Sequence, residues 1–309
     1  MRSLALALIL LALPGCRTRP WELGELADGG GDGGPRPVDL ARPPDLAAPD
    51  LTSIDLAAPD LVSTDLARPP WCVPGSELIY VIDQNRQLAR FDPLARRFTD
   101  VGRVTCPAPP NDSAFSMAVQ RDGTAWVVFD SGRLYRLDTR TLACAATPFD
   151  TQREGVGGPF GMGFTAETPG SMVEVLHIAA DPRNGNSFLG RLDLQTFRVT
   201  QLAALDARAE LTGAADGRLW AFFPEGPNAR VAQIDRQSGR EVSRIPVQIP
   251  GIVRPGFAFS HWGGEFWLFV YDDPGSTQVH RLRPDGTIAA VLLNTGRHIV
   301  GAGVSICAP

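Results

Sequence analysis

The 309-residue chain contains no lysine, so all 29 of its basic residues are arginine. This absence excludes Schiff-base chemistry and catalysis by a lysine nucleophile. The basic residues are nearly balanced by 34 acidic residues, so charge does not favour nucleic acid as a partner. Only four histidines occur, and no H-x-H, H-E-x-x-H or G-x-S-x-G sequence is present. The sequence therefore assigns no catalytic residue.

The N-terminus has an apolar run, but it is too short to span a membrane. Arg2 precedes the run at 4–13, which is about half the length of a transmembrane helix. The following Leu13-Pro14-Gly15-Cys16 resembles a bacterial lipobox, which implies cleavage before a lipidated Cys16. Residues 1–16 are therefore expected to be a lipoprotein signal peptide, and the alternative is a plain secreted protein.

A lipobox cysteine would anchor the protein at the cell envelope. Proteins with this motif carry more than one acyl chain, which is what stable membrane anchoring requires. Arg17 rather than aspartate follows the cysteine. By resemblance to Gram-negative sorting signals, this favours the outer membrane.

Residues 17–71 have the composition of a disordered linker. Glycine dominates 29–34, and Asp-Leu pairs then recur mostly five residues apart among proline and alanine. A period of five fits neither a helix nor a strand, and the prolines favour an extended backbone without a core. We expect a solvated stalk that ends where a folded domain begins at Cys72.

Residues 72–309 contain one short phrase five times. The copies are Leu88-Ala-Arg-Phe-Asp92, Leu134-Tyr-Arg-Leu-Asp138, Leu189-Gly-Arg-Leu-Asp193, Val231-Ala-Gln-Ile-Asp235 and Val279-His-Arg-Leu-Arg283. A repeat of about 40–55 residues is typical of a β-propeller. An apolar run precedes each copy, and a run of small residues precedes four of these, as expected for the inner strands of a blade. The sequence predicts an all-β, five-bladed propeller. An extra hairpin in the long third repeat would make six blades.

The first repeat lacks its innermost strand, and the last stretch of the chain has no blade of its own. Residues 301–306 are small and apolar, so we expect them to complete the first blade and close the ring. This closure would bring Cys307 beside Cys72 and pair them in a disulfide. Cys106 and Cys144 fall near the outer strands of neighbouring blades and form the second predicted pair. An even number of cysteines in an exported domain favours disulfides.

Several segments resemble uncharacterised propeller lipoproteins and secreted proteins of high-GC soil bacteria. They are Phe160-Gly-Met-Gly-Phe164, Asp122-Gly-Thr-Ala-Trp126, Asp216-Gly-Arg-Leu-Trp220 and the ending at 301–309. The resemblance covers residues 72–309 and implies the fold and the location only. The Asp-Gly turns also resemble those of propeller lyases, lactonases and sugar dehydrogenases, but such turns are a folding device and imply no active site.

Ligands of propellers usually bind at the end of the channel where the second-to-third-strand loops and the blade-to-blade loops meet. The residues expected there are Asp83, Asp130, Asp181, Glu225, Asp272, Arg153, Arg297, His261 and His298. If the carboxylates converge, they would hold calcium, and otherwise they are ordinary turn residues. His261 and His298 are the two candidates for acid–base chemistry or metal binding. No other cofactor is expected.

These features favour a monomeric, lipid-anchored binding module at the cell envelope, with a protein or a polysaccharide as its partner. One alternative is a lactonase-like or lyase-like enzyme with a site around His261, His298 and the acidic loop ends. The other is a purely structural envelope protein.

Overall fold

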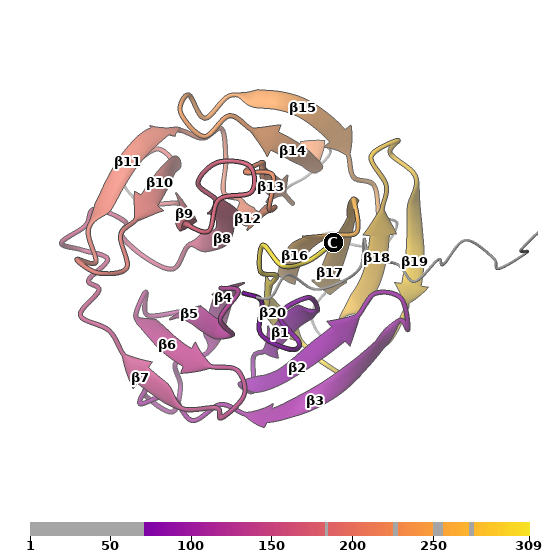
Figure 1. Cartoon of the computed structure of the whole chain (residues 1–309), viewed down its shortest axis with the longest axis horizontal. Helices are drawn as coiled ribbons and strands as arrows, with labels where there is room; N and C mark the ends of the chain where they lie inside the picture. Colours follow the sequence, from indigo (N-terminus) through magenta and orange to yellow (C-terminus); the bar gives the residue numbers. More distant parts are fainter. Residues whose placement is uncertain (1–70, 183–184, 225–227, 250–255, 272–274) are drawn as a thin grey trace, which may run out of the picture. The chain divides into compact units, whose positions relative to one another are not determined.

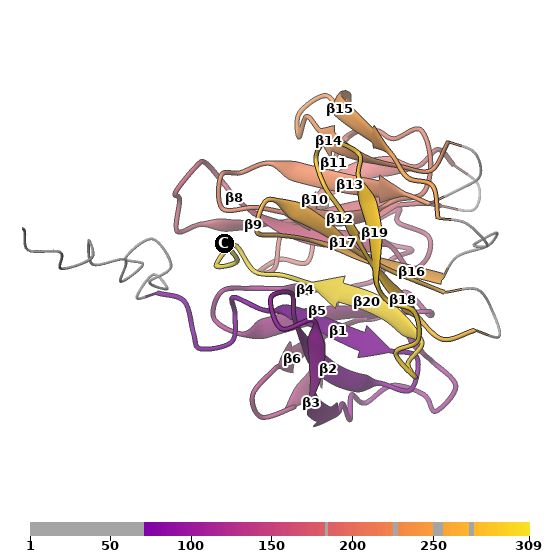
Figure 2. The same ribbon diagram turned by 90° about the vertical axis from the view of Figure 1, so that its right-hand side faces the viewer.

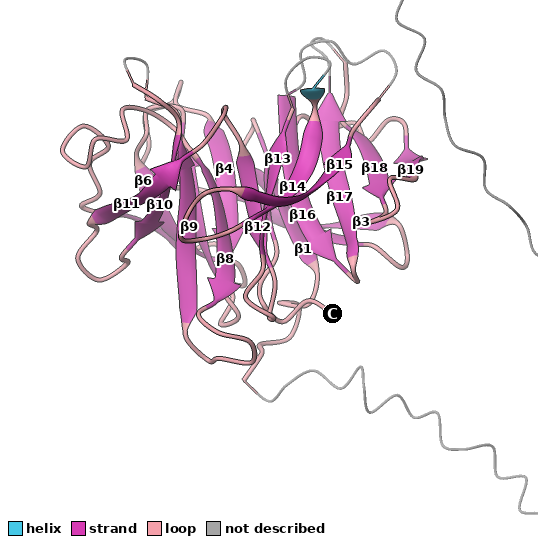
Figure 3. Cartoon of the chain, turned by 90° about the horizontal axis from the view of Figure 1, so that it is seen from above, coloured by secondary structure: helices cyan, strands magenta, loops and turns pink. Residues whose placement is uncertain are grey.

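The computed structural model describes residues 71–182, 185–224, 228–249, 256–271 and 275–309. Five four-stranded antiparallel sheets stand around a common axis (Figure 1), which confirms the predicted five-bladed propeller. The described part consists of strands joined by loops, and its one helical residue is Asn228, in a short 3-10 turn that Figure 3 draws in cyan. The predicted signal peptide with Cys16, the linker up to residue 70, Glu225 and Asp272 lie outside the described residues.

Each blade is named by its place along the chain, and its strands are given from the axis outward. Blade 1 comprises β20 (Ile299–Gly303), β1 (Ile79–Asp83), β2 (Gln87–Asp92) and β3 (Arg97–Arg103). Blade 2 comprises β4 (Ala114–Val119), β5 (Thr124–Phe129), β6 (Leu134–Asp138) and β7 (Cys144–Ala146). Blade 3 comprises β8 (Gly161–Ala166), β9 (Glu174–Ala180), β10 (Phe188–Leu192) and β11 (Val199–Ala204). Blade 4 comprises β12 (Glu210–Gly213), β13 (Leu219–Phe223), β14 (Arg230–Ile234) and β15 (Glu241–Pro246). Blade 5 comprises β16 (Gly256–Trp262), β17 (Glu265–Tyr271), β18 (Gln278–Leu282) and β19 (Ile288–Leu292).

The recurring phrase forms the third strand of every blade. Its alternation places neighbouring residues on opposite faces of the sheet. Leu88 packs in the cluster between blades 1 and 2, whereas Phe91 packs in the cluster between blades 5 and 1. Five such clusters fill the five gaps between blades. The second strands, such as β5, are buried on both faces, which explains their continuous apolar sequences.

The aspartate that ends the phrase stabilises the following turn. Asp138 Oδ1 accepts hydrogen bonds from the backbone N–H groups of Arg140 (2.8 Å) and Thr141 (3.0 Å). Four residues after the aspartate, Leu142 has a left-handed backbone with φ 61°. Asp92 and Asp193 accept equivalent bonds in blades 1 and 3. The Asp of the phrase therefore has a structural role.

The small residues of the innermost strands are required because neighbouring backbones touch around the axis. A Cβ added to Gly161 of β8 would lie 2.2 Å from the carbonyl oxygen of Ala209, just before β12. One added to Gly213 of β12 would lie 2.0 Å from the carbonyl oxygen of Phe164. The structure leaves no space for a side chain at these crossings.

The C-terminal strand β20 completes blade 1, as predicted, and lies beside β1 in Figure 2. Its register pairs Ile82 with Gly301 and Tyr80 with Gly303. The strand spans Ile299–Gly303 and so ends earlier than the expected 301–306. The following Ser305 turns the chain, since its hydroxyl donates to Ser76 O (2.7 Å) and accepts from Cys307 N (3.0 Å).

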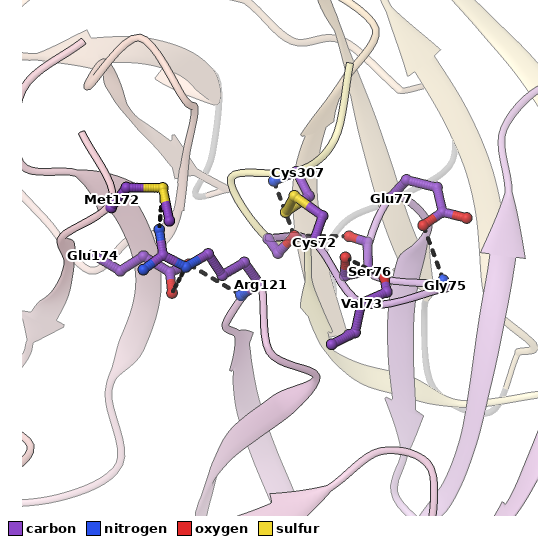
Figure 4. Close-up of a disulfide and its surroundings, with 10 residues drawn as sticks. Cys72, Val73, Gly75, Ser76, Glu77, Arg121, Met172, Glu174 and Cys307 are labelled. Carbon is purple, nitrogen blue, oxygen red and sulfur yellow. Dashed lines mark hydrogen bonds and ion pairs between the residues drawn. A yellow bond between two sulfur atoms is a disulfide. The ribbon is translucent and has the colours of Figure 1, made fainter. Parts of the chain in front are cut away.

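Both predicted disulfides are present. Cys72–Cys307 joins the segment before β1 to the segment after β20 (Figure 4). Cys106–Cys144 joins the outer parts of blades 1 and 2. Beside the first disulfide, Val73 N donates to Arg121 O (3.1 Å). The side chain of Arg121 contacts Glu174 and Met172 of blade 3. The segment around the Cys72–Cys307 disulfide is thus connected to blade 2 and, through Arg121, to blade 3.

Candidate functional site

The propeller has two distinct ends. One end, here called the loop face, is formed by the loops between second and third strands and by the loops that lead into each first strand. The other end carries the Cys72–Cys307 disulfide and the turns between first and second strands. The sequence predicted all candidate ligand residues on the loop face.

His261 is an exception to that prediction because it lies near the opposite end. It pairs with Phe266 beside the Gly263–Gly264 turn, whereas Gly256 at the start of β16 pairs with Tyr271. Five residues of strand separate these positions by about 17 Å. The buried His261 ring stacks on Trp220, with 6.4 Å between centroids, and burial lowers the pKa of His261 to about 4. His261 and His298 therefore do not share a site.

The loop face contains an open pocket of about 780 Å³, here called the outer pocket. It is formed by loops of blades 2 and 3 and by the segment that leads into blade 4. Asp130 and Asp181, both predicted, line the same pocket. The other lining residues are Phe115, Ser131, Gln152, Gly155, Gly157, Gly158, Pro159, Pro182 and Arg208. The sequence thus identified two of its charged side chains and missed the third, Arg208.

A smaller cavity of about 220 Å³, here called the vestibule, lies at the mouth of the central channel. It is lined from four blades, by Gln84 and Val300 of blade 1, by Phe115 of blade 2, by Glu210 of blade 4 and by Phe257 and Tyr271 of blade 5, among others. The vestibule shares Phe115, Asp130 and Arg208 with the outer pocket. These three residues therefore mark the boundary between the two cavities.

Arg208 extends across the channel mouth. Its guanidinium carbon lies 5.1 Å from the centre of the Phe115 ring and 5.1 Å from that of Phe257. These rings come from blades 2 and 5, which are not adjacent, while Arg208 itself precedes β12 of blade 4. Such cation–π contacts fix a guanidinium in place. Among the residues that the structure describes, none forms a hydrogen bond or ion pair with this guanidinium.

Glu210 follows Arg208 by two residues and lines the vestibule. Its carboxyl group is buried. Its Oε1 accepts hydrogen bonds from Ser116 Oγ (2.6 Å) and Met162 N (3.0 Å). Burial raises the pKa of Glu210 to about 8, although these hydrogen bonds oppose the shift. Glu210 is therefore mostly neutral at pH 7.

The other predicted residues occupy separate positions on or near the loop face. Asp83 stabilises its own turn by accepting from Asn85 N and Gln87 N, both at 2.9 Å. Arg153 pairs with Glu154 (3.0 Å). Arg297 forms an ion pair with Asp100 and lies over Phe98, towards the outside of blade 1.

His298 is also held by neighbours within the fold. Its Nδ1 lies 2.8 Å from Gln84 Nε2, and its ring stacks on Tyr271 with 5.1 Å between centroids. Of the described candidates, Asp130 and Asp181 line the same pocket. Partial burial, followed by the nearby charge of Asp112, raises the pKa of Asp130.

The described residues contain no group of three or more His, Cys, Asp or Glu side chains arranged to hold a metal ion. In the same part of the chain, no helix has the length and apolar character of a membrane span.

Comparisons with known proteins found solved structures of low identity. No family model and no curated protein matches the sequence. TolB from Acinetobacter baumannii is 18% identical with a TM-score of 0.42, over 69% of this chain and 52% of that chain. The extracellular domain of a hybrid two-component system of B. thetaiotaomicron is 14% identical with a TM-score of 0.38, over 71% of this chain and 28% of that one. A protein of unknown function from Bacteroides caccae is 10% identical with a TM-score of 0.38, over 73% of this chain and 97% of that one. The chain thus spans about half the length of the TolB chain and less of the second protein.

Proposed function

We propose that this protein is a ligand-binding module of the cell envelope, exported by the signal in residues 1–16 and anchored through a lipidated Cys16. The two disulfides support an extracytoplasmic location, because disulfides persist in oxidising compartments. The linker at 17–71 would hold the propeller away from the membrane and leave its loop face accessible.

The observation that carries this proposal is the outer pocket. Its volume of about 780 Å³ lies in the range of small-ligand sites. It is lined by loops of blades 2 and 3 and by the segment that leads into blade 4, so several loops can contact one ligand. The pocket also contains a positioned guanidinium, that of Arg208, which has no ion-pair partner among the described side chains. A polar ligand would supply such a partner.

The enzyme alternative receives less support from the described residues. His261 and His298 lie towards opposite ends of the propeller, and His298 is engaged by Gln84 and Tyr271. Ser116 is completely buried beside a neutral Glu210 and is not exposed to the outer pocket. Among the described residues that line the outer pocket there is no histidine, and the hydroxyl of Ser131 donates to Asp112 Oδ2 (2.7 Å).

Thermal unfolding of the full-length protein in detergent tests the binding function. The panel of added compounds consists of amino acids, short peptides, and neutral and acidic sugars. Gly158→Trp places a large ring in the outer pocket at a position with no atom within 4 Å of a new Cβ. Leu94→Trp is the matched control, because Leu94 is 79% exposed and lies outside the pocket.

We expect at least one compound to raise the Tm of the natural protein and of Leu94→Trp while leaving Gly158→Trp unchanged. The proposal is wrong if no compound raises the Tm, or if Gly158→Trp responds as strongly as the control. The anchor is tested separately by labelling cells with radioactive palmitate. Label on the natural protein and its loss in Cys16→Ser would support lipidation, and an unlabelled natural protein would contradict it.

A further inference from the structure

We propose that the Arg208 guanidinium binds the carboxylate of a zwitterionic peptide in the outer pocket, while Asp130 and Asp181 bind its ammonium groups. This inference rests on the proposed binding function and specifies the ligand class of the same pocket. It is carried by the position of Arg208 and by the signs of the three charges around the cavity.

The guanidinium of Arg208 is already held in place before a ligand arrives. Phe115 and Phe257 flank it at 5.1 Å each. These contacts use the faces of the aromatic rings, so the N–H groups of the guanidinium remain available as hydrogen-bond donors. An arginine side chain that is fixed in advance loses less conformational entropy on binding. Two parallel N–H donors match the two oxygens of a carboxylate.

Within the residues that the structure describes, the charge of Arg208 has no ion-pair partner. Glu210, two residues later, is close enough to be influenced by this charge, but its carboxyl group is mostly neutral because of burial. The positive charge of Arg208 is therefore not neutralised by Glu210 and can attract an anionic group of a ligand.

The two aspartates restrict which anion fits. Asp130 and Asp181 line the same pocket as Arg208, so two acidic side chains and one basic side chain border one cavity. Ser187 Oγ donates to Asp181 Oδ1 (2.6 Å) and holds that carboxylate in place. A polyanion such as an oligouronate or a phosphate polymer would be repelled by these groups. A peptide with one free carboxylate and one or two ammonium groups complements all three charges.

Isothermal titration of the full-length protein in detergent tests this assignment with defined probes. The parent probe is the tetrapeptide Ala-Lys-Ala-Ala with free termini. Its C-terminal amide removes the carboxylate, its N-acetyl and N-ε-acetyl form removes both amines, and trigalacturonic acid represents acidic saccharides. The variants are Arg208→Gln and Asp181→Asn. Arg97→Gln is the matched control, because Arg97 is an exposed arginine on β3 outside both cavities.

We expect the parent peptide to bind and its amide to bind at least tenfold more weakly. Arg208→Gln should also bind the parent peptide at least tenfold more weakly than the natural protein does. In this variant the parent peptide and its amide should have the same affinity. Asp181→Asn should reduce the difference in affinity between the parent peptide and the acetylated peptide. Arg97→Gln should behave like the natural protein. Agreement of these results would tie the carboxylate to Arg208 and the amines to the aspartates.

The inference is overturned if the amide binds as well as the parent peptide, if Arg208→Gln retains the difference between them, or if trigalacturonic acid binds more tightly than the peptide. If all peptides fail to bind while another compound stabilises the natural protein and not Gly158→Trp, the peptide assignment fails and the binding function stands. If no compound acts through the pocket at all, both fail.

Discussion

The carboxyl group of Glu210 on β12 accepts a 2.6 Å hydrogen bond from the hydroxyl of Ser116 on β4. These residues belong to blades 4 and 2, which are separated in the ring by blade 3. The same oxygen accepts from Met162 N of blade 3. One buried side chain therefore joins the inner strands of three blades next to the axis, in the lining of the vestibule.

The first prediction concerns the effect of Glu210 on stability as pH rises. Its pKa is about 8 in the folded protein and ordinarily 4.5. The folded state thus binds more protons in this interval, and its stability decreases as pH increases. Between pH 7 and 8 we expect the free energy of unfolding to fall by about 1 kcal/mol, near the limit of 1.4 kcal/mol per pH unit for one proton. Denaturant unfolding at the two pH values measures it.

Glu210→Gln should remove most of this decrease. Glu174→Gln is the matched control and should keep most of the decrease in stability. Burial raises the pKa of Glu174 only to about 7, so this group releases less of a proton between pH 7 and 8 than Glu210 does. Measurements above pH 7 also avoid His177 and His261, whose pKa values burial lowers to about 3 and 4 and which act with the opposite sign below pH 6.5. An unchanged pH dependence in Glu210→Gln would refute the assignment.

The second prediction compares the two disulfides. Replacing Cys72 and Cys307 by serine opens a loop with a sequence separation of 235, whereas Cys106 and Cys144 are 38 apart. In the chain-entropy model the losses are about 5 and about 4 kcal/mol, because the closed loop is longer in the first case. Denaturant midpoints of the two double variants measure the order. A larger loss from the 106–144 pair would show that closure of the ring is not the more stabilising constraint.

The third prediction tests the close approach of the innermost strands. Gly161→Ala would place a Cβ 2.2 Å from the carbonyl oxygen of Ala209 and 2.8 Å from the Cα of Glu210, both backbone atoms. We expect it to destabilise the propeller by about 1–3 kcal/mol or more, as in other overpacked cores. Gly158→Ala, three residues earlier, meets no atom within 4 Å and should be nearly neutral. Equal Tm values for the two variants would contradict the packing described here.

The fourth prediction concerns the turn that follows each phrase. Asp138→Ala removes the acceptor of two backbone hydrogen bonds and should cost about 1 kcal/mol at pH 7. Asp138→Asn keeps a side-chain oxygen and should lose less. Backbone N–H donors lower the pKa of Asp138 below its usual 3.8. The difference between the natural protein and Asp138→Ala should therefore be present above that value and diminish as pH falls through the lowered pKa, which urea unfolding from pH 7 to pH 2.5 would reveal.

The architecture could be predicted because each blade repeats the same physical solution. The Asp of the phrase marks a turn, the apolar runs mark strands buried on both faces, and small residues mark strands near the axis. The missing first strand of blade 1 and the small residues at the C-terminus led to the correct closure. The same reasoning placed Cys72 beside Cys307. The end of β20 was predicted less well, since Val304 and Ile306 are apolar but lie beyond the strand.

The site could be predicted only in part. Asp130 and Asp181 follow second strands, so their place on the loop face depends on strand order alone. Arg208 was missed because its environment is created by Phe115 and Phe257, which meet only when blades 2, 4 and 5 surround one axis. Glu210 was missed because it lies inside a short buried strand. His261 was assigned to the wrong end, although the Gly263-Gly264 turn that follows it already indicated the direction of its strand.

The pairing of β20 with β1 also determines the stage of folding at which blade 1 and the ring can be completed. The strand β1 is the first of the propeller, but its hydrogen-bonding partner β20 (Ile299–Gly303) follows all the other strands. Until those residues emerge, blade 1 keeps one unpaired edge, and such edges readily pair with other strands. The strands of blades 2 to 5 all precede residue 293, whereas blade 1 is complete only once β20 has joined it. A nascent chain interrupted before residue 299 would therefore present an open, adhesive sheet instead of a sealed ring.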